Sequence, residues 1–361
     1  MKGRLTSLIS LSLAVAICSY TSDASAYNTI KCNGNSTKWS SLPPQMRAAT
    51  NSFPNGVWRE ALADAVSHWN TNPSKFYFNL TYDDSNIALN NGENEIWFSS
   101  DDSILINYPA VTYWWFKSDC TLKEADIIFD NRVSYTTSTA KSSLWDYGGS
   151  NRPFQTTASH ELGHSLGLAH ENRYYNIMGS DWTHVHTNAG IATNYPGEDA
   201  SNGAVSLYGL YSTPLEELSV SHWKWLGTSG EYSTHTRTEM YNTSGAVLSS
   251  FTDAGEPIYN VNRGQQVQIE LTYENNGANT KSFQVGFYIS TNDNITTSDS
   301  FLGEAPYTLA KDTPYTAKNT VTIPSNLTPG KYYIGAIVDK NNVVGEVYED
   351  NNSTYIPIKV N

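Results

Sequence analysis

Residues 156–180 read TTASHELGHSLGLAHENRYYNIMGS, and this stretch holds three of the chain's eight histidines. His160 and His164 are four residues apart, so on a helix both rings project from one face, about one turn apart. Gly167 follows one turn later, where a residue without a Cβ atom can adopt a left-handed conformation and end the helix. The chain then turns and brings His170 back. The stretch therefore predicts a helix, a sharp turn and three converging imidazoles.

Three neutral imidazoles leave one position of a tetrahedral metal ion open, which is typical of catalytic zinc, whereas structural zinc sites are closed by four protein ligands. Glu161 follows the first ligand directly and can accept a proton from water at the open position. We therefore predict a hydrolase with Zn²⁺ held by His160, His164 and His170, and with Glu161 as general base. A lone histidine is more simply a core or surface residue, but this joint spacing rarely arises by chance.

The N-terminus has the pattern of a secretory signal peptide. In residues 1–26, Lys2 and Arg4 precede an apolar run, and the segment ends in the small residues Ala-Ser-Ala. The run is shorter than the ~20 residues of a spanning helix, and no later segment is apolar enough to cross a membrane. We expect a secreted, extracellular protein, which can also associate with the cell surface, with no membrane span.

The net charge and the cysteines indicate which binding partners and which cellular compartment suit this protein. The formal net charge is −13, which argues against nucleic acid as a partner. Cys32 and Cys120 are the cysteines outside the signal segment, and in an oxidising compartment they most simply form one disulfide. The acidic loops 83–86 and 290–299 could hold Ca²⁺, but such loops are more often ordinary turns, so calcium stays open.

Residues 27–212 combine helical and strand-like segments. Apolar side chains recur at helical spacing in 55–70, from Val57 to Trp69, which predicts an amphipathic helix. Segments rich in β-branched and aromatic residues follow at 76–82, 94–100, 110–117 and 125–131. A helix, a run of strands and the histidine-bearing helix indicate an α+β domain.

The pattern changes after residue 212. Residues 213–236 contain the Gly/Ser/Thr-containing stretch GTSGEYSTHT and are expected to form a linker. From 237 to 361 short alternating strands continue without helical periodicity, which predicts an all-β, immunoglobulin-like sandwich. Because the three histidines and Glu161 precede residue 212, we expect the first domain to act on small peptides without the second.

The spacing of His160, Glu161, His164, Gly167 and His170, followed by Met178, resembles the zinc motif and Met-turn of the metzincin metallopeptidases. Residues 125–131 and 203–211 resemble the strand before the active-site helix and the last helix of matrixin-like members. The resemblance implies a mixed twisted sheet with an active-site helix, supporting roles for Gly167 and Met178, and a zinc endopeptidase that cleaves extracellular proteins. It also implies that an edge strand at 111–115 binds the substrate as an added β-strand.

The chain departs from the family pattern after the Met-turn. Ser180 stands where astacin-like and serralysin-like members carry a tyrosine, and the proline typical of matrixins is absent. The subfamily therefore stays open. Four residues near the motif in sequence are candidates for the substrate pocket, although packing is the simpler role for each one: Tyr174, Tyr175, His184 and His186.

The second domain resembles CARDB-type modules, which are immunoglobulin-like domains of exported prokaryotic proteins. The segments that carry the resemblance are YENNG (273–277), 287–299, 327–339 and GEVYEDNN (345–352). Such a module implies binding to a surface or matrix ligand, and a stabilising appendage is an equal alternative.

Two other functions compete with a secreted zinc endopeptidase. One is an adhesin or surface-binding protein with a vestigial metal site, which would predict a damaged motif, whereas every predicted ligand and Glu161 are present. The other is a zinc hydrolase of a non-peptide surface polymer, which the motif alone does not exclude.

Overall fold

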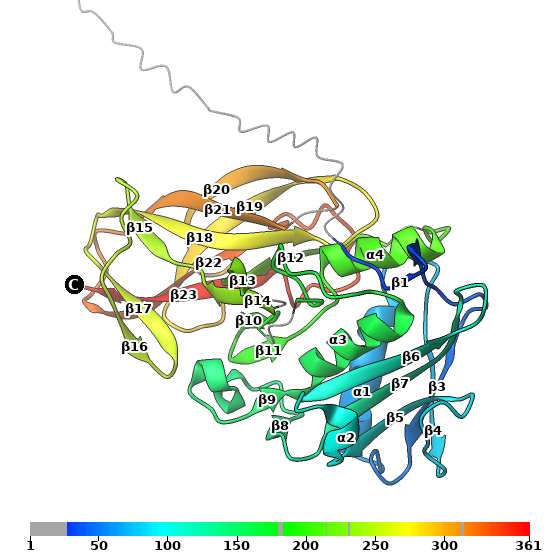
Figure 1. The fold of residues 1–361 in the computed structure, drawn as a ribbon. Helices are drawn as coiled ribbons and strands as arrows, with labels where there is room; N and C mark the ends of the chain where they lie inside the picture. Colours follow the sequence, from blue (N-terminus) through cyan, green and yellow to red (C-terminus); the bar gives the residue numbers. More distant parts are fainter. Residues whose placement is uncertain (1–26, 180–182, 214, 230–231, 312–313) are drawn as a thin grey trace, which may run out of the picture.

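The computed structural model describes residues 27–179, 183–213, 215–229, 232–311 and 314–361. Figure 1 shows a domain of helices and a sheet beside a β-sandwich. This confirms the expected fold class, an α+β domain followed by an all-β domain. The expected signal peptide, residues 1–26, lies outside the described residues. Within the described ranges, no helix combines the length and apolar character needed to cross a membrane.

A five-stranded sheet in the order β4-β3-β5-β7-β6 forms one layer of the first domain. The pairs β4–β3, β3–β5 and β5–β7 are parallel, and β6 runs antiparallel to β7. The sheet is therefore mixed, and β6 is an edge strand, as predicted for 111–115. The strands are β3 (Gln45–Ala49), β4 (Asn79–Asp84), β5 (Asn94–Ser99), β6 (Ala110–Phe116) and β7 (Leu122–Asp130).

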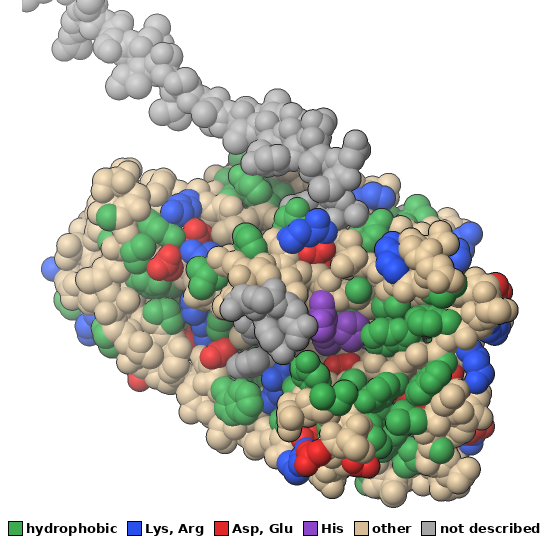
Figure 2. Space-filling view, in the orientation of Figure 1, with side chains coloured by type: hydrophobic (Ala, Val, Ile, Leu, Met, Phe, Trp, Pro, Cys, Tyr) green, Lys and Arg blue, Asp and Glu red, His purple; other side chains and the backbone are tan. Residues whose placement is uncertain are grey.

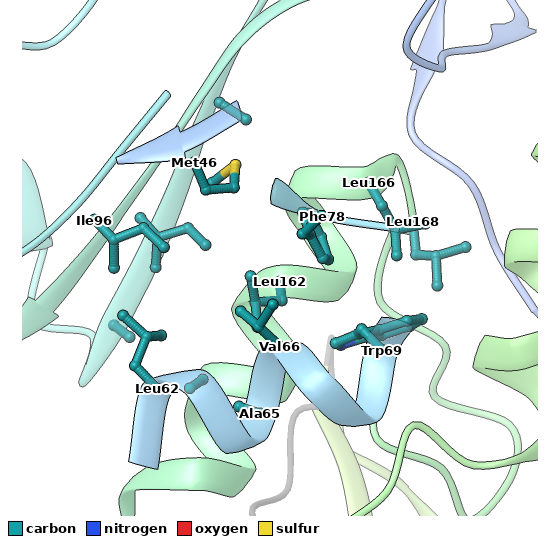
Figure 3. Close-up of a cluster of buried hydrophobic side chains, with 14 of the residues drawn as sticks. Met46, Leu62, Ala65, Val66, Trp69, Phe78, Ile96, Leu162, Leu166 and Leu168 are labelled. Carbon is teal, nitrogen blue, oxygen red and sulfur yellow. The ribbon is translucent and has the colours of Figure 1, made fainter. Parts of the chain in front are cut away.

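Helices α1 (Val57–Asn70) and α3 (Phe154–Leu166) pack against each other and against this sheet. Figure 3 shows Leu62 and Trp69 of α1 in one buried cluster with Leu162 of α3 and strand residues. The Trp69 indole donates a 2.8 Å hydrogen bond to the Ser159 carbonyl, so the packing also fixes α3 along its axis. The helix that carries the first two histidines is thereby held rigidly.

The amphipathic helix was predicted with one error at its start. Val57 is 59% exposed, whereas Trp58 contacts the core. Val57 is the first residue of α1, and the core contacts begin one residue later. The remaining helices are α2 (Asp102–Leu105), α4 (Glu198–Tyr208) and the 3₁₀ turns Lys141–Ser143 and Trp145–Tyr147.

The second domain is a sandwich of two sheets around one apolar cluster. Val267, Ile269, Leu271 and Tyr273, predicted to share a strand face, are all fully buried in that cluster. One sheet has the order β16 (Ser250–Asp253), β17 (Glu256–Val261), β23 (Ser353–Val360), β22 (Gly330–Ile337), β19 (Lys281–Ser290) and β20 (Ser300–Leu309). In the other, β18 (Gln266–Asn275) pairs with β12 (Leu218–Ser221), β15 (Met240–Asn242) and β21 (Tyr315–Thr322).

The segment 213–236, expected to be a linker, is largely structured. Leu218 and Val220 of β12 are fully buried in the sandwich core, and the intervening serines face the other way. β13 (Trp223–Ser229) and β14 (Tyr232–Arg237) form an antiparallel hairpin. Only two apolar residues alternate in β12, which is too short a pattern to stand out in a polar stretch. The sandwich core therefore begins at Leu218.

Short strand pairs complete the fold. The predicted disulfide is present and joins Cys32 of β1 to Cys120 in the loop between β6 and β7. The pairs are β1 (Lys31–Cys32) with β2 (Asn35–Ser36), β8 (Tyr135–Thr136) with β9 (Arg152–Pro153), and β10 (His186–Asn188) with β11 (Ile191–Thr193).

Polar contacts cross the interface between the two domains. The Thr354 hydroxyl of β23 donates to the Thr187 carbonyl at 2.9 Å, and Lys141 pairs with Asp293 at 2.8 Å and Glu256 at 3.0 Å. The segment that follows the active-site motif thus rests on the sandwich.

Candidate peptidase site

Gly167 ends α3 and turns the chain, as predicted from the motif. Its φ of 114° lies in the left-handed region, and a Cβ atom there would approach the Thr37 carbonyl oxygen to 2.7 Å. Both the conformation and the space therefore require glycine. After the turn, Ala169 donates its backbone N–H to the Asn28 carbonyl at 3.1 Å, and Ile30 donates to the Gly167 carbonyl at 2.9 Å. The N-terminal segment thus guides the chain towards His170.

The three histidines of the motif converge. Nε2 of His160 and Nε2 of His170 are 3.2 Å apart, and the ring centres of His164 and His170 are 4.7 Å apart. One ligand nitrogen from each of the three lies within 4.8 Å of the others. This is the arrangement that a single metal ion requires of three imidazoles.

Backbone carbonyls orient the first two imidazoles. Nδ1 of His160 donates to the Ile177 carbonyl at 2.7 Å, and Nδ1 of His164 donates to the Leu168 carbonyl at 2.8 Å. Each bond leaves the Nε2 lone pair free, as in metal-binding histidines generally. Burial lowers the pKa of His164 to about 3 and lowers the pKa of His160 well below its usual range. Both rings are therefore neutral, which is the state that binds metal.

Glu161 is a buried carboxylate beside this cluster. It is 6% exposed, and its Oε2 accepts a 2.7 Å hydrogen bond from the Thr112 hydroxyl of the edge strand β6. Burial raises the pKa of Glu161 to about 7, although the Thr112 hydrogen bond and the charge of Arg152 both act to lower it. A carboxylate with a pKa near neutrality can both accept and return a proton.

Met178 packs against the active-site helix α3. It is 1% exposed, and a Cβ atom on Gly163 of α3 would overlap its sulfur. Its carbonyl accepts a 3.0 Å hydrogen bond from the Glu171 backbone N–H, which closes the loop that follows His170. Gly163 and Met178 therefore fit together as a pair, and the neighbouring Ile177 supplies the carbonyl that orients His160.

The site opens into a cleft of about 810 Å³. Figure 2 shows histidine side chains at the surface beside hydrophobic side chains. β6 forms one wall, the N-terminal segment around Ile30 another, and Arg152 and Ile177 also line it. The remaining lining residues are Thr29, Lys31, Asn107, Tyr108, Pro109, Ala110, Val111, Thr112, Trp114, Thr156, Thr157, His160, Glu161, His164, Ala169, His170 and Gly179.

The four candidate pocket residues do not line this cleft. Tyr174 is half-buried under the Arg173 guanidinium. Tyr175 is buried, and its hydroxyl lies 3.0 Å from the Ser221 hydroxyl of the sandwich. His184 and His186 are also buried and lie beside a sandwich strand. These four residues therefore lie outside the cleft, although they are close to the histidine motif in sequence.

Two further predictions concern the residue after the Met-turn and the acidic loop 83–86. Ser180, where the pattern departs from related families, lies outside the described residues. Beside the predicted calcium loop 83–86, carboxylate oxygens of Asp84, Glu93 and Glu95 lie within 4.8 Å of one another. Calcium binding there stays a prediction.

Three contributors to the site were missed from the sequence: Thr112, Arg152 and the segment 28–31. Each comes from an element distant in sequence from the histidine motif, and a single threonine or arginine has no distinguishing pattern. The prediction of 111–115 as a substrate-binding edge strand was the one signal that pointed towards Thr112.

Comparison with known families agrees with this geometry. Residues 38–209 match the matrixin family of peptidases, and residues 253–355 match the CARDB family. The first domain is therefore a matrixin domain, of a family of zinc metallopeptidases, and the second is a CARDB domain. No curated protein matches the chain.

Some solved structures resemble parts of the chain. The CARDB domain of a Pyrococcus furiosus protein, in complex with di-metal ions, is 16% identical over 42% of this chain and 91% of its own, with a TM-score of 0.25. A Niemann-Pick type C2 protein from Japanese carpenter ant is 12% identical over 30% of this chain and 85% of its own, with a TM-score of 0.21. At these scores the likeness carries no functional meaning.

Proposed function

We propose that this protein is a secreted zinc endopeptidase. The observation that carries the proposal is the convergence of three imidazoles beside a buried carboxylate in an open cleft. His160, His164 and His170 would hold the metal ion, because one nitrogen of each ring lies within 4.8 Å of the others while backbone carbonyls hold the Nδ1 atoms of the first two. When bound, zinc would act as a Lewis acid that acidifies a water molecule and polarises the scissile carbonyl.

Glu161 is proposed as the general base and later the general acid. Its Oε2 is engaged by Thr112, which leaves Oε1 to accept a proton from the attacking water. The pKa near 7 lets the same group return that proton to the leaving amine. Thr112 acts as a positioning residue, since its hydroxyl fixes the carboxylate rotamer.

The edge strand β6 is proposed to bind the substrate backbone. It is the last strand of the sheet order and lines the cleft from Ala110 to Trp114. An extended peptide would add to this edge through main-chain hydrogen bonds, which bind without demanding one side chain. Extracellular proteins with exposed, extended segments are therefore the proposed substrates.

Secretion rests on the signal-like residues 1–26 and on the disulfide. A Cys32–Cys120 bridge is typical of proteins that function in oxidising compartments. We propose that the CARDB domain binds a surface or matrix ligand and that calcium in the acidic loops is an accessory ion.

Digestion of casein by the purified full chain tests this function. We expect hydrolysis that a chelator abolishes and that stoichiometric zinc restores. Zinc binding without hydrolysis of any protein substrate would favour an adhesin or a hydrolase of a non-peptide polymer instead.

A further inference from the structure

A second cluster of metal-binding side chains lies at the domain interface, away from the cleft. His184 and His186 follow the Met-turn segment, and Glu274 comes from β18 of the sandwich. Nε2 of His184 lies 3.1 Å from Oε1 of Glu274, and Nε2 of His186 lies 3.6 Å from Oε2. All three side chains are essentially inaccessible to solvent. The two histidines thus face both oxygens of one carboxylate.

The hydrogen bonds around His186 leave a lone pair facing that carboxylate. Its Nδ1 donates to the Val220 carbonyl at 3.2 Å, so in the neutral ring Nε2 carries no proton. Among the described residues, Nε2 has no hydrogen-bond partner. Two acceptors, Nε2 and Oε2, therefore face each other.

The buried Glu274 carboxylate is flanked by two histidines. In the described part of the chain, no lysine or arginine forms an ion pair with it. An ionised group in this position is costly unless a positive charge compensates it.

The surroundings fix the carboxylate as they would a metal ligand. The Ser219 hydroxyl donates to Oε2 of Glu274 at 3.1 Å, and the Asn276 amide donates to that hydroxyl at 3.2 Å. Gly197, with φ of 79°, closes another side, because a Cβ atom there would lie 3.0 Å from Nε2 of His184. Such outer contacts orient ligands in metal sites.

We propose that His184, His186 and Glu274 bind a second divalent metal ion, Zn²⁺ by the donor set, which joins the two domains. Two imidazole nitrogens and one carboxylate form a His₂Glu donor set of the kind that binds zinc in proteins. Ligand atoms 3.1–3.6 Å apart agree with the roughly 3.3 Å that separates ligands 2.0–2.1 Å from a tetrahedral zinc ion. The ion is structural because the ligands lie away from the cleft and from solvent.

Zinc content and anomalous diffraction of the full chain test this site. The protein is loaded with zinc, freed of excess by gel filtration, and its zinc is counted by mass spectrometry. We expect two ions per wild-type chain and one per Glu274→Gln chain. Glu270→Gln is the matched control, since Glu270 is also a buried carboxylate of β18 but pairs with Lys224 at 2.6 Å, so it should keep two.

Crystals of the wild-type protein test the second site in a second way, which does not require a variant to fold. Anomalous data collected at the zinc edge should show one peak at His160, His164 and His170 and a second between His184, His186 and Glu274. A peak at the first site alone, with one ion per chain, would overturn the second site while leaving the proposed peptidase intact. Absence of the first peak would instead count against the peptidase.

Discussion

The Thr112 hydroxyl donates a 2.7 Å hydrogen bond to Oε2 of Glu161, and so links the edge strand of the sheet to the active-site helix. The same hydroxyl lies 3.1 Å from the Glu161 carbonyl oxygen. One side chain of the substrate-binding strand therefore sets the position of the proposed general base.

Replacing Thr112 with valine should slow catalysis without removing zinc. Valine keeps the shape and loses the hydroxyl, and a hydrogen bond to a charged group contributes about 1.5–3 kcal/mol, so kcat/KM should fall roughly 10- to 150-fold, mainly in kcat. Thr112→Ser should recover most of the activity. Steady-state kinetics on a fluorogenic peptide measure both, and an unchanged kcat in the valine variant would refute the positioning role.

Gly163→Ala should destabilise the protein, although alanine is normally about 1 kcal/mol better than glycine inside a helix. The reason is that the new methyl group would overlap the Met178 sulfur and approach Trp69 to 3.1 Å. Thermal unfolding of both single variants and of Gly163→Ala/Met178→Ala measures the coupling. The double variant should lose less stability than the two single losses combined, and a Gly163→Ala protein with a raised Tm would contradict this packing.

The histidine motif could be predicted from sequence because its geometry is local. His160, His164 and Gly167 are fixed relative to one another by helical spacing and by one left-handed residue, and His170 follows within three positions. The β-sandwich strands were also predictable, since Val267 to Tyr273 alternate over a long run. Local periodicity is present in the sequence itself.

The tertiary partners could not be predicted in the same way. Thr112 reaches Glu161 from 49 residues away, and Glu274 reaches His184 from 90 residues away. His184 and His186 were predicted to line the substrate pocket because they follow the motif, yet the chain carries them to the domain interface. Contacts of this kind depend on how the layers stack, which single-residue patterns do not encode.

Stability should decline as the pH rises from about 5 to 9, and Glu217 contributes to this decline. Glu217 is 8% exposed, and burial raises its pKa to about 8 although the backbone N–H groups of Val347 and Tyr348 donate to it. A folded pKa above the unfolded value of about 4.3 means that the proton favours folding. This contribution is complete below about pH 4 and is lost as the pH rises through 8.

Glu217→Gln mimics the protonated carboxyl group and should therefore flatten that decline. Melting temperatures measured from pH 5 to 9 should fall less steeply in the variant, and its Tm at pH 9 should exceed that of the wild type. Some slope should remain, because burial also raises the pKa of Glu346, to about 9. Parallel curves for variant and wild type would rule out this role for Glu217.

A chain that ends at Tyr211 should lose stability and activity. The sequence predicted an independent first domain. In the structure, however, the Tyr175 hydroxyl forms a hydrogen bond with the Ser221 hydroxyl across the interface. Lys141 also forms ion pairs there with Glu256 and Asp293. Removing the sandwich would expose these buried groups and release the segment after Met178. Circular dichroism and hydrolysis of a small peptide would measure the loss, and a shortened chain with full activity at 37 °C would show that the domains are independent.

The most direct test of the proposed peptidase is the effect of Glu161→Gln on zinc content and hydrolysis in the same preparation. Glutamine has nearly the shape of glutamate and can still accept the Thr112 hydrogen bond, but it cannot take a proton from water. We expect an unchanged number of zinc ions per chain and a kcat lower by about 10²- to 10⁴-fold, as expected for loss of a general base. A zinc-loaded Glu161→Gln protein that cleaves peptides at the wild-type rate would show that Glu161 is not the general base.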